Sequence, residues 1–449
     1  MAIWSKGGDE TAALVHEFTV GDDFLYDRVI APYDCLGSLA HVAMLAHVGL
    51  LPADQARALS AGLRDLHRGF IAGAWTVEAA DEDVHSKIEA LLTTRLGDAG
   101  RRLHTGRSRN DQVLTAIRLW QKHELCRAAD GVAAAARALL TQARTHEFHP
   151  FPGYTHWQRA MPSSLGMFFA SHAQALVDDL ALFEGAFALS DSCPLGSGAG
   201  YGVGLPLDRA MTATLLGFAR VGLAGADGNG RGKVETAVLD ALGAVVNDLS
   251  RLAADLVFFT SAECGFFTIA AGFTTGSSIM PQKRNLDLFE LLRGRASRFL
   301  GLRTGLFATT VGLPSGYSRD LQDTKALCID GVRLARQGLA VVAAAVPTLQ
   351  PVRERILAAL TPEIYATDEA YRLVRDEGVP FREAYQRVGK DLARLGTLDH
   401  DAVVRGRTHA GSTGALGLDA LARRLDGDAT RWRARADALT AIWDRLLDG

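Results

Sequence analysis

The chain has 449 residues, 48% of them hydrophobic, and a formal net charge of -3. That length is enough to bury a large core in two or three domains, and the slightly acidic balance argues against nucleic acid as a partner. The first ten residues lack the apolar core of a signal peptide, and the most apolar later run, 338–346, is too short to span a bilayer, so we expect a cytoplasmic protein without a membrane partner.

Short helices are predicted for the first part of the chain, before Arg107. Gly49, Pro52 and Gly73 interrupt the helical pattern there. A long helix is then predicted to follow Asp111, because apolar residues recur along one helical face at Val113, Ile117, Trp120 and Leu125.

Three more long helices are predicted downstream, and alternating strand patterns are scarce. One begins at Val234, one follows Asn285, and one runs from Leu321 towards Val346; the first carries apolar residues at Val238, Leu242, Val245, Leu249, Leu252, Leu256 and Phe259. Helices this long are most readily buried side by side. We therefore predict an all-α fold with a central long-helix bundle.

Shorter helices are predicted again after Pro351. Gly378-Val379-Pro380 indicates a helix stop before a new start at Phe381. The pattern divides the chain into an N-terminal helical domain (1–106), a central bundle domain (107–355) and a small C-terminal helical domain (356–449).

The loop from Thr274 to Asn285 combines hydroxyl groups with fixed positive charge. Gly272 and Gly276 permit unusual backbone angles, and Asn285 is expected to cap the helix that follows. A carboxylate would there meet Lys283 and a helix N-terminus together. The plain alternative is an ordinary loop between helices with one surface lysine.

Two other polar segments are candidate anion sites. Arg109 and Asn110 stand where a loop gives way to the helix near Asp111, so fork-shaped donors and a helix N-terminus can address a carboxylate. Read alone, Ser108-Arg109-Asn110-Asp111 would be a capping sequence with an acidic first turn. His156 lies in a glycine-bounded polar loop, although a lone histidine is more often structural, and the methyl group of Thr155 would then simply pack.

Five strings in the chain occur in the order found in one known family. The sequence resembles the argininosuccinate lyases of the fumarase and aspartase superfamily in Asp81-Glu82-Asp83-Val84-His85, in Leu103-His104-Thr105-Gly106-Arg107-Ser108-Arg109-Asn110-Asp111-Gln112-Val113, in Gly153-Tyr154-Thr155-His156-Trp157-Gln158-Arg159-Ala160, in Gly276-Ser277-Ser278-Ile279-Met280-Pro281-Gln282-Lys283-Arg284-Asn285, and in Tyr317-Ser318-Arg319-Asp320-Leu321-Gln322-Asp323-Thr324-Lys325.

The resemblance implies a reaction and an assembly. The reaction would be the reversible β-elimination of argininosuccinate to arginine and fumarate, without cofactor. The alternative is release of fumarate from a different N-substituted aspartate. The resemblance further implies a three-domain helical subunit in a homotetramer with a twenty-helix core, whose active sites are each shared by three chains.

The resemblance also implies roles for individual residues. Ser277 would be the base, Lys283 would clamp the doubly charged intermediate, and His156, paired with Glu290 and beside Thr155, would act as acid or polarise a bound carboxylate. Substrate binding would fall to Asp27, His85, Arg109, Asn110, Gln158, Asn285, Tyr317, Gln322 and Lys325.

Three departures from the family pattern concern substrate choice. Leu286 stands where a proline is usual, Asp23 where a substrate-binding serine is usual, and the glycine-rich run 225–233 replaces a more acidic stretch. They leave the elimination residues in place but put in doubt which group the substrate nitrogen carries. Retention of the catalytic residues argues against a purely structural relative or a ligand-binding protein without activity.

The five cysteines are expected to be reduced packing residues. Cys35, Cys126, Cys193, Cys264 and Cys328 show no Cys-x-x-Cys spacing and no nearby histidine pairs. Neither disulfides nor a metal site is therefore predicted.

Overall fold

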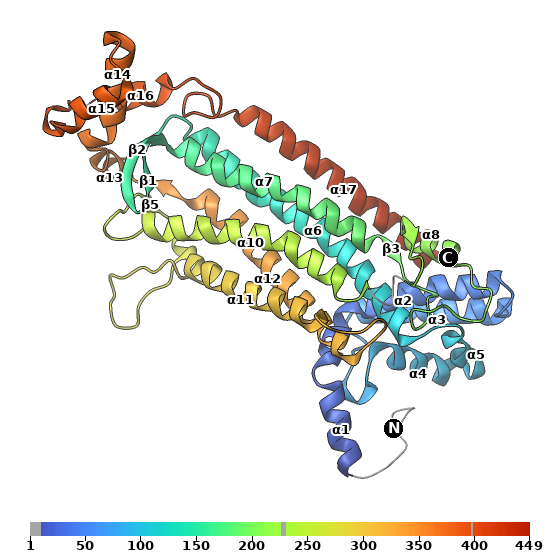
Figure 1. Cartoon of the computed structure of the whole chain (residues 1–449). Coiled ribbons are helices and arrows are strands. Elements are labelled where there is room, and N and C mark those ends of the chain that lie inside the picture. Colours follow the sequence, from blue (N-terminus) through green and yellow to red (C-terminus); the bar gives the residue numbers. More distant parts are fainter. Residues whose placement is uncertain (1–9, 226–229, 397) are drawn as a thin grey trace.

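The computed structural model describes residues 10–225, 230–396 and 398–449. Its centre is a bundle of long helices lying side by side (Figure 1), which confirms the all-α prediction. The bundle consists of α6 (Arg109–Thr145), α7 (Leu165–Ser190), α10 (Lys233–Phe259), α11 (Asp287–Thr310) and α12 (Thr324–Ala345).

Further helices gather at the two ends of the bundle (Figure 1). At one end lie α1 (Glu10–Val20), α2 (Asp23–His47), α3 (Ala53–Ile71), α4 (Val84–Leu96), α5 (Asp98–Arg101) and α8 (Arg209–Leu216). At the other lie α13 (Arg353–Ala358), α14 (Ala366–Glu377), α15 (Phe381–Gly389) and α16 (His400–Gly406). From that second end α17 (Leu418–Asp448) returns along the bundle towards the first.

Short 3-10 turns and strand pairs connect these helices. The 3-10 turns are η1 (Ala79–Asp81), η2 (Arg102–His104), η3 (Ala271–Phe273), η4 (Arg319–Gln322), η5 (Val346–Thr348), η6 (Pro362–Tyr365) and η7 (Leu392–Arg394). The antiparallel pairs are β1 (Pro150–Thr155) with β2 (Gln158–Ser164), and β5 (Phe267–Thr268) with β6 (Gln350–Pro351). The parallel pair is β3 (Ser192–Cys193) with β4 (Arg220–Val221).

Most of the predicted helix boundaries are confirmed. The stripe from Val234 lies in α10, whose residues at those positions are buried in the main core. The break around Gly49 and Pro52 separates α2 from α3. Gly378 ends α14 in a left-handed conformation, and α15 starts at Phe381.

Three long helices were not predicted. The expectation of short helices before Arg107 is wrong for α2, whose 25 residues make it longer than α11 and α12. The other two were missed for opposite reasons. Helix α7 is apolar on nearly all sides, so its sequence shows no contrast between faces. Helix α17 is rich in Arg and Asp, and the expectation of only short helices after Pro351 is wrong there. Its apolar residues nonetheless form a buried stripe, with Leu421, Leu425 and Trp432 on the bundle side.

The predicted cap of α11 is also wrong. The residue before the helix is Leu286, and among the described residues no side chain caps the first turn. The Asn285 amide instead donates to Thr275 Oγ1 and to the Gly276 carbonyl, both at 3.4 Å, because Thr275 and Asn285 face each other in a β-bridge. Asn285 therefore closes the preceding loop and does not start the helix.

One helix of the described part, α2, has the length and apolar character of a membrane-crossing helix. Of its most apolar window, 72% is buried inside the fold, as in the core helix of a soluble protein. The cysteines are all free thiols: four are buried and Cys264 is half-buried.

Candidate active site

A polar cavity of about 160 Å³ opens at the end of the bundle where the chain begins. Segments far apart in sequence form it: the α1–α2 junction, the turn before α4, the start of α6, the segment just before α10, the loop that leads into η4, η4 itself and the start of α12. It is lined by Thr19, Val20, Asp23, Asp27, Glu82, Asp83, Arg109, Asn110, Val113, Arg231, Tyr317, Arg319, Gln322 and Lys325. Six of the predicted substrate-binding residues are among them.

Lys325 is held by two carboxylates in one corner of this cavity. Its ammonium group lies 2.9 Å from Asp23 Oδ2 and also contacts Asp27 Oδ1. The second oxygen of Asp27 accepts the Val84 amide at 2.8 Å, so this carboxylate also fixes the start of α4. Burial opposes the charge of Lys325, but Asp27 and Asp23 outweigh it and raise its pKa.

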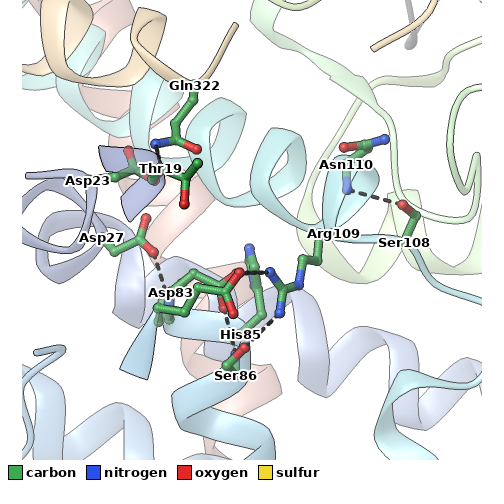
Figure 2. A network of polar contacts seen from close by, with 12 residues as sticks. Thr19, Asp23, Asp27, Asp83, His85, Ser86, Ser108, Arg109, Asn110 and Gln322 are labelled. Atoms are coloured by element: carbon green, nitrogen blue, oxygen red, sulfur yellow. Dashed lines mark hydrogen bonds and ion pairs between the residues drawn. The ribbon is translucent and has the colours of Figure 1, made fainter. Parts of the chain in front are cut away.

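Arg109 lies across two acidic residues in another corner (Figure 2). Its Nη1 is 2.9 Å from Glu82 and 3.0 Å from Asp83, and its Nη2 donates to Ser86 Oγ at 3.0 Å. Asp83 also caps α4 through the Ser86 amide. Glu82 has a φ of 69°, a left-handed conformation that costs a side chain free energy and is typical of functional turns.

His85 lies buried behind the cavity and does not line it. Its Nδ1 is 2.7 Å from Asp34 Oδ2, and both side chains are less than 5% exposed. Burial alone would lower the pKa of His85, but the facing carboxylate of Asp34 outweighs it and the pKa is raised. The structure thus places this predicted substrate-binding residue in a buried ion pair.

The end of α1 is fastened to the opposite wall by its main chain. The Thr19 carbonyl accepts a hydrogen bond from the Gln322 side-chain amide at 3.0 Å (Figure 2). It also accepts one from the Arg319 guanidinium at 3.0 Å. Gln322, a predicted substrate-binding residue, therefore holds the N-terminal segment over the cavity.

The start of α6 has the capping geometry that its sequence allows. The Ser108 hydroxyl accepts from the Asn110 amide, and Asp111 accepts from the Ser108 amide at 3.0 Å. Asp111 also accepts from the amides of Gly196 and Gly198, which brings a glycine-rich loop to the site. Burial raises the pKa of Asp111 to about 6, and these amides oppose the rise. Arg109 and Asn110 serve the cavity from this first turn.

Thr155, His156 and Gln158 lie at the opposite end of the bundle, in the β1–β2 hairpin. Thr155 pairs with Gln158, so His156 and Trp157 alone form the turn. Their φ angles are 52° and 61°, as in a type I′ turn, which usually carries Asn or Gly at these positions. The exposed Trp157 packs edge-on against Phe258, with ring centroids 4.9 Å apart. The turn presents His156 to the outside of the chain.

Ser277, Lys283 and Asn285 lie in the loop between β5 and α11, with Glu290 on the first turn of α11. The Ser277 hydroxyl accepts hydrogen bonds from the backbone amides of Ile279, at 3.3 Å, and Met280, at 3.1 Å. Lys283 and Glu290 are exposed. No described residue makes a side-chain hydrogen bond or ion pair with the ammonium of Lys283.

The predicted site residues therefore fall into two groups at opposite ends of the bundle (Figure 1). Helix α11 separates the Ser277 loop from Tyr317, and its 24 residues span about 36 Å. Helix α6 separates Arg109 from the His156 hairpin, and its 37 residues span about 55 Å. The two groups do not meet within one chain.

Some lining residues carried no prediction of their own. Arg231 lies within the glycine-rich run 225–233 noted in the sequence, of which residues 226–229 lie outside the described part. Its guanidinium covers the Tyr317 ring at 5.3 Å. Asp23 was noted only as a departure from a family pattern. Asp23 and Arg231 are seen to reach the cavity only once α2 and α10 are packed around α6 and α12.

Comparison with known proteins gives consistent matches. Residues 8–301 match a family model described as lyase. The chain is 45% identical to a protein named argininosuccinate lyase from Sorangium cellulosum, covering 95% of this chain and 99% of that protein. It is 43% identical to a protein of the same name from Stenotrophomonas maltophilia, with coverage of 96% and 99%.

Solved structures match in fold. A crystal structure of EDDS lyase in complex with formate superposes with a TM-score of 0.81 at 23% identity, covering 96% of this chain and 93% of that one. The class II fumarase of Schistosoma mansoni gives a TM-score of 0.72 at 16% identity, with coverage of 91% and 97%. At these identities the likeness concerns the fold alone.

Proposed function

The chain belongs to the argininosuccinate lyase family, and from this membership we propose that it cleaves argininosuccinate to arginine and fumarate in the cytoplasm. The observation that carries the proposal is the 45% identity over 95% of the chain to a protein of that name. The reaction needs a base, a clamp for the intermediate and an acid. A proton leaves the carbon beside one carboxylate, the bond from the neighbouring carbon to the guanidino nitrogen breaks, and the electrons form the double bond of fumarate while the nitrogen gains a proton.

Ser277 is the proposed base. A serine hydroxyl is a weak base in water, but its alkoxide would be stabilised by the two loop amides that it accepts, from Ile279 and Met280. The free ammonium of Lys283 and closure of the loop over substrate would stabilise the same charge further. The hydrogen bonds that hold the loop in shape would therefore also favour proton abstraction by Ser277.

The doubly charged intermediate would be clamped by Lys283 and Asn285. Both stand in the Ser277 loop, which is closed at its base by the bridge between Thr275 and Asn285. His156, paired with Glu290, would act as the acid or polarise a carboxylate of the substrate. Thr155 would hydrogen-bond the substrate. The left-handed turn supports this role, because it holds His156 away from its own chain.

The amino-acid half of the substrate would occupy the cavity of Asp27, Arg109 and Lys325. Asn110, Tyr317 and Gln322 line the same space. His85, buried behind the cavity, would influence substrate binding through the segment that carries Asp83. Gln158 would contact substrate from the hairpin at the other end of the bundle.

Assembly of several chains would complete each site. The two groups of residues are separated by at least the length of α11, which no loop movement bridges. Helix α11 also exposes apolar side chains, including Leu291, Leu300 and Phe307, which a soluble chain usually covers. We propose the tetramer implied by the family, with sites shared between chains.

The test is to follow fumarate absorbance with purified protein and argininosuccinate. Release of one fumarate per arginine is expected without added metal or cofactor. If fumarate were released from another N-succinyl compound but not from argininosuccinate, the proposed reaction class would stand and the proposed substrate would be wrong. No fumarate from either would refute the lyase.

A further inference from the structure

The β1–β2 hairpin that carries His156 is weakly held by its own two strands. Within the described residues its sheet has only these two strands. Pro152 faces Pro162 across the pair, and neither has an N–H group to donate to the other. The register also shifts between Gly153 and Tyr154. A hairpin of this kind is marginal by itself, so its position depends on what packs against it.

Arg407 joins this hairpin to the C-terminal helices, which lie beside it at one end of the bundle (Figure 1). Its Nη1 donates to the Pro162 carbonyl at 2.7 Å, and its Nη2 lies 2.8 and 3.0 Å from the two carboxylate oxygens of Asp368 in α14. The side chains of Arg407 and Asp368 are 22% and 20% exposed, so both are largely shielded from water. The guanidinium therefore ties β2 to α14.

The backbone of Arg407 is itself held in place. Its carbonyl accepts hydrogen bonds from the Ser412 hydroxyl at 2.5 Å and from the Gly414 amide at 2.8 Å. A Cβ atom at Gly414 would lie 2.6 Å from that carbonyl oxygen and 2.5 Å from the Arg405 oxygen, so only glycine permits this close approach. The arginine is thus fixed at its backbone and at its guanidinium, as a residue that orients another element must be.

The bond to Pro162 lies some way from the turn of the hairpin. Three residue pairs separate Pro162 from His156 and Trp157, about 10 Å along the strands. A tilt of about 6° at Pro162 would therefore move His156 by about 1 Å, and a misplacement of that size in a catalytic group can cost about 10²-fold in rate. Arg159 gives a second link, to the Ala359 carbonyl at 3.1 Å, but this arginine is exposed and water competes for it.

We propose that Arg407, oriented by Asp368, is a positioning residue that sets the β1–β2 hairpin and, with it, the place of His156 in the active site. The inference rests on the proposed function, in which His156 acts on substrate. Neither Arg407 nor Asp368 lines the polar cavity at the other end of the bundle. The small C-terminal helices carry none of the proposed catalytic residues, and this contact gives them a part in turnover.

The experiment compares Arg407→Met with the wild type in the full chain. Its kcat for argininosuccinate should fall about tenfold, while the dissociation constant of arginine, which would bind in the cavity at the opposite end, should change less than about twofold. Arg407→Lys keeps the charge but lacks the fork that reaches Pro162 and Asp368 together, so it should restore only part of kcat. Asp368→Asn should lower kcat about threefold alone and add nothing to Arg407→Met, because it acts through Arg407.

Arg372→Met is the matched control. Arg372 is an exposed arginine on α14, the helix of Asp368, and its ion pairs with described residues all lie within that helix. This variant should keep wild-type kcat and arginine binding. Amide hydrogen exchange gives a readout that needs no substrate: residues 150–164 should exchange about tenfold faster in Arg407→Met and at the wild-type rate in Arg372→Met. Melting curves and light scattering show whether fold and assembly are kept.

Three outcomes would overturn the inference. Hairpin exchange in Arg407→Met could equal that of the wild type, kcat could stay within about twofold of the wild type, or kcat and arginine affinity could fall together through general loss of fold. Fumarate release by the wild type is measured separately. If the wild type releases none while the hairpin of Arg407→Met exchanges faster, the proposed function is wrong and the setting of the hairpin by Arg407 stands.

Discussion

Ser277 and Ser278 are adjacent, but only Ser277 accepts two loop amides through its hydroxyl. Ser277→Ala should lower kcat about 10³-fold with little change in KM, since a base acts mainly in the transition state. Ser278→Ala should be mild, and Lys283→Ala should affect both constants because its charge already attracts the bound carboxylate. Steady-state kinetics of the three variants decide between these roles. If Ser277→Ala kept near-normal turnover and Ser278→Ala lost it, the assignment of Ser277 as the base would be wrong.

Asp179 in α7 is a buried carboxyl, and its Oδ2 makes no hydrogen bond with any residue that the structure describes. Burial, followed by the charges of Asp248 and Asp178, raises its pKa to about 7. An acid with a raised folded pKa binds a proton in the folded state that the unfolded chain has already lost, so its effect on stability becomes more unfavourable as pH rises from about 4 to about 7.

Asp179→Asn should therefore gain stability relative to wild type between pH 5 and pH 8, by on the order of 1 kcal/mol after allowance for solvent screening. Urea unfolding at the two pH values measures it. Asp240→Asn, an exposed carboxylate paired with Arg303, is the control and should change little. An equal gain at both pH values would mean that the effect is not titration of Asp179.

At the scale of elements, the β1–β2 turn combines two demands at one position. His156 must adopt a left-handed conformation and, in the proposed mechanism, must also act on substrate. Asparagine tolerates the conformation better than most residues. His156→Asn should keep or slightly raise the melting temperature while lowering kcat about 10²-fold or more. A fall in both, by contrast, would mean that the histidine is needed to form the turn.

Elements with a clear contrast between faces were predictable from the sequence. The α10 stripe is amphipathic and was found, whereas α7, apolar all round, and α17, dominated by charged residues, were missed. The His156–Trp157 turn carries neither Asn nor Gly, so turn chemistry did not indicate it.

The candidate site was predictable only where a motif identified it. The sequence indicated the Ser277 loop and the α6 start because local residues there combine charge with a helix end. Asp23 and Arg231 are more than 200 residues apart, and only the packed bundle brings them to one cavity. Likewise, the pairing of His85 with Asp34 depends on tertiary contact between α4 and α2.

At the scale of the whole molecule, the two groups of site residues test the shared-site proposal. Ser277→Ala and Lys325→Met alter opposite ends of the bundle, so each should be inactive alone. Unfolding and refolding the two together should restore part of the activity, because some sites then receive both intact ends. Differently tagged chains confirm that mixed assemblies form, and mixed assemblies without activity would contradict shared sites.

The exposed face of α11 provides a second test. Leu300 is 63% exposed in the single chain, and Leu300→Glu should dissociate the assembly and abolish turnover while leaving arginine bound in the cavity. Light scattering and calorimetry measure the two effects. Ile71→Glu, at the exposed end of α3, is the control and should change neither.

The 36 Å of α11 between the two groups has a kinetic consequence. When a catalytic centre is divided between chains, the rate per mole of chain depends on how concentrated the chains are. Dilution should lower it, and substrate, which touches both halves at once, should oppose that loss by drawing the chains together. Specific activity measured over a dilution series, with and without preincubation in substrate, should therefore give two diverging curves.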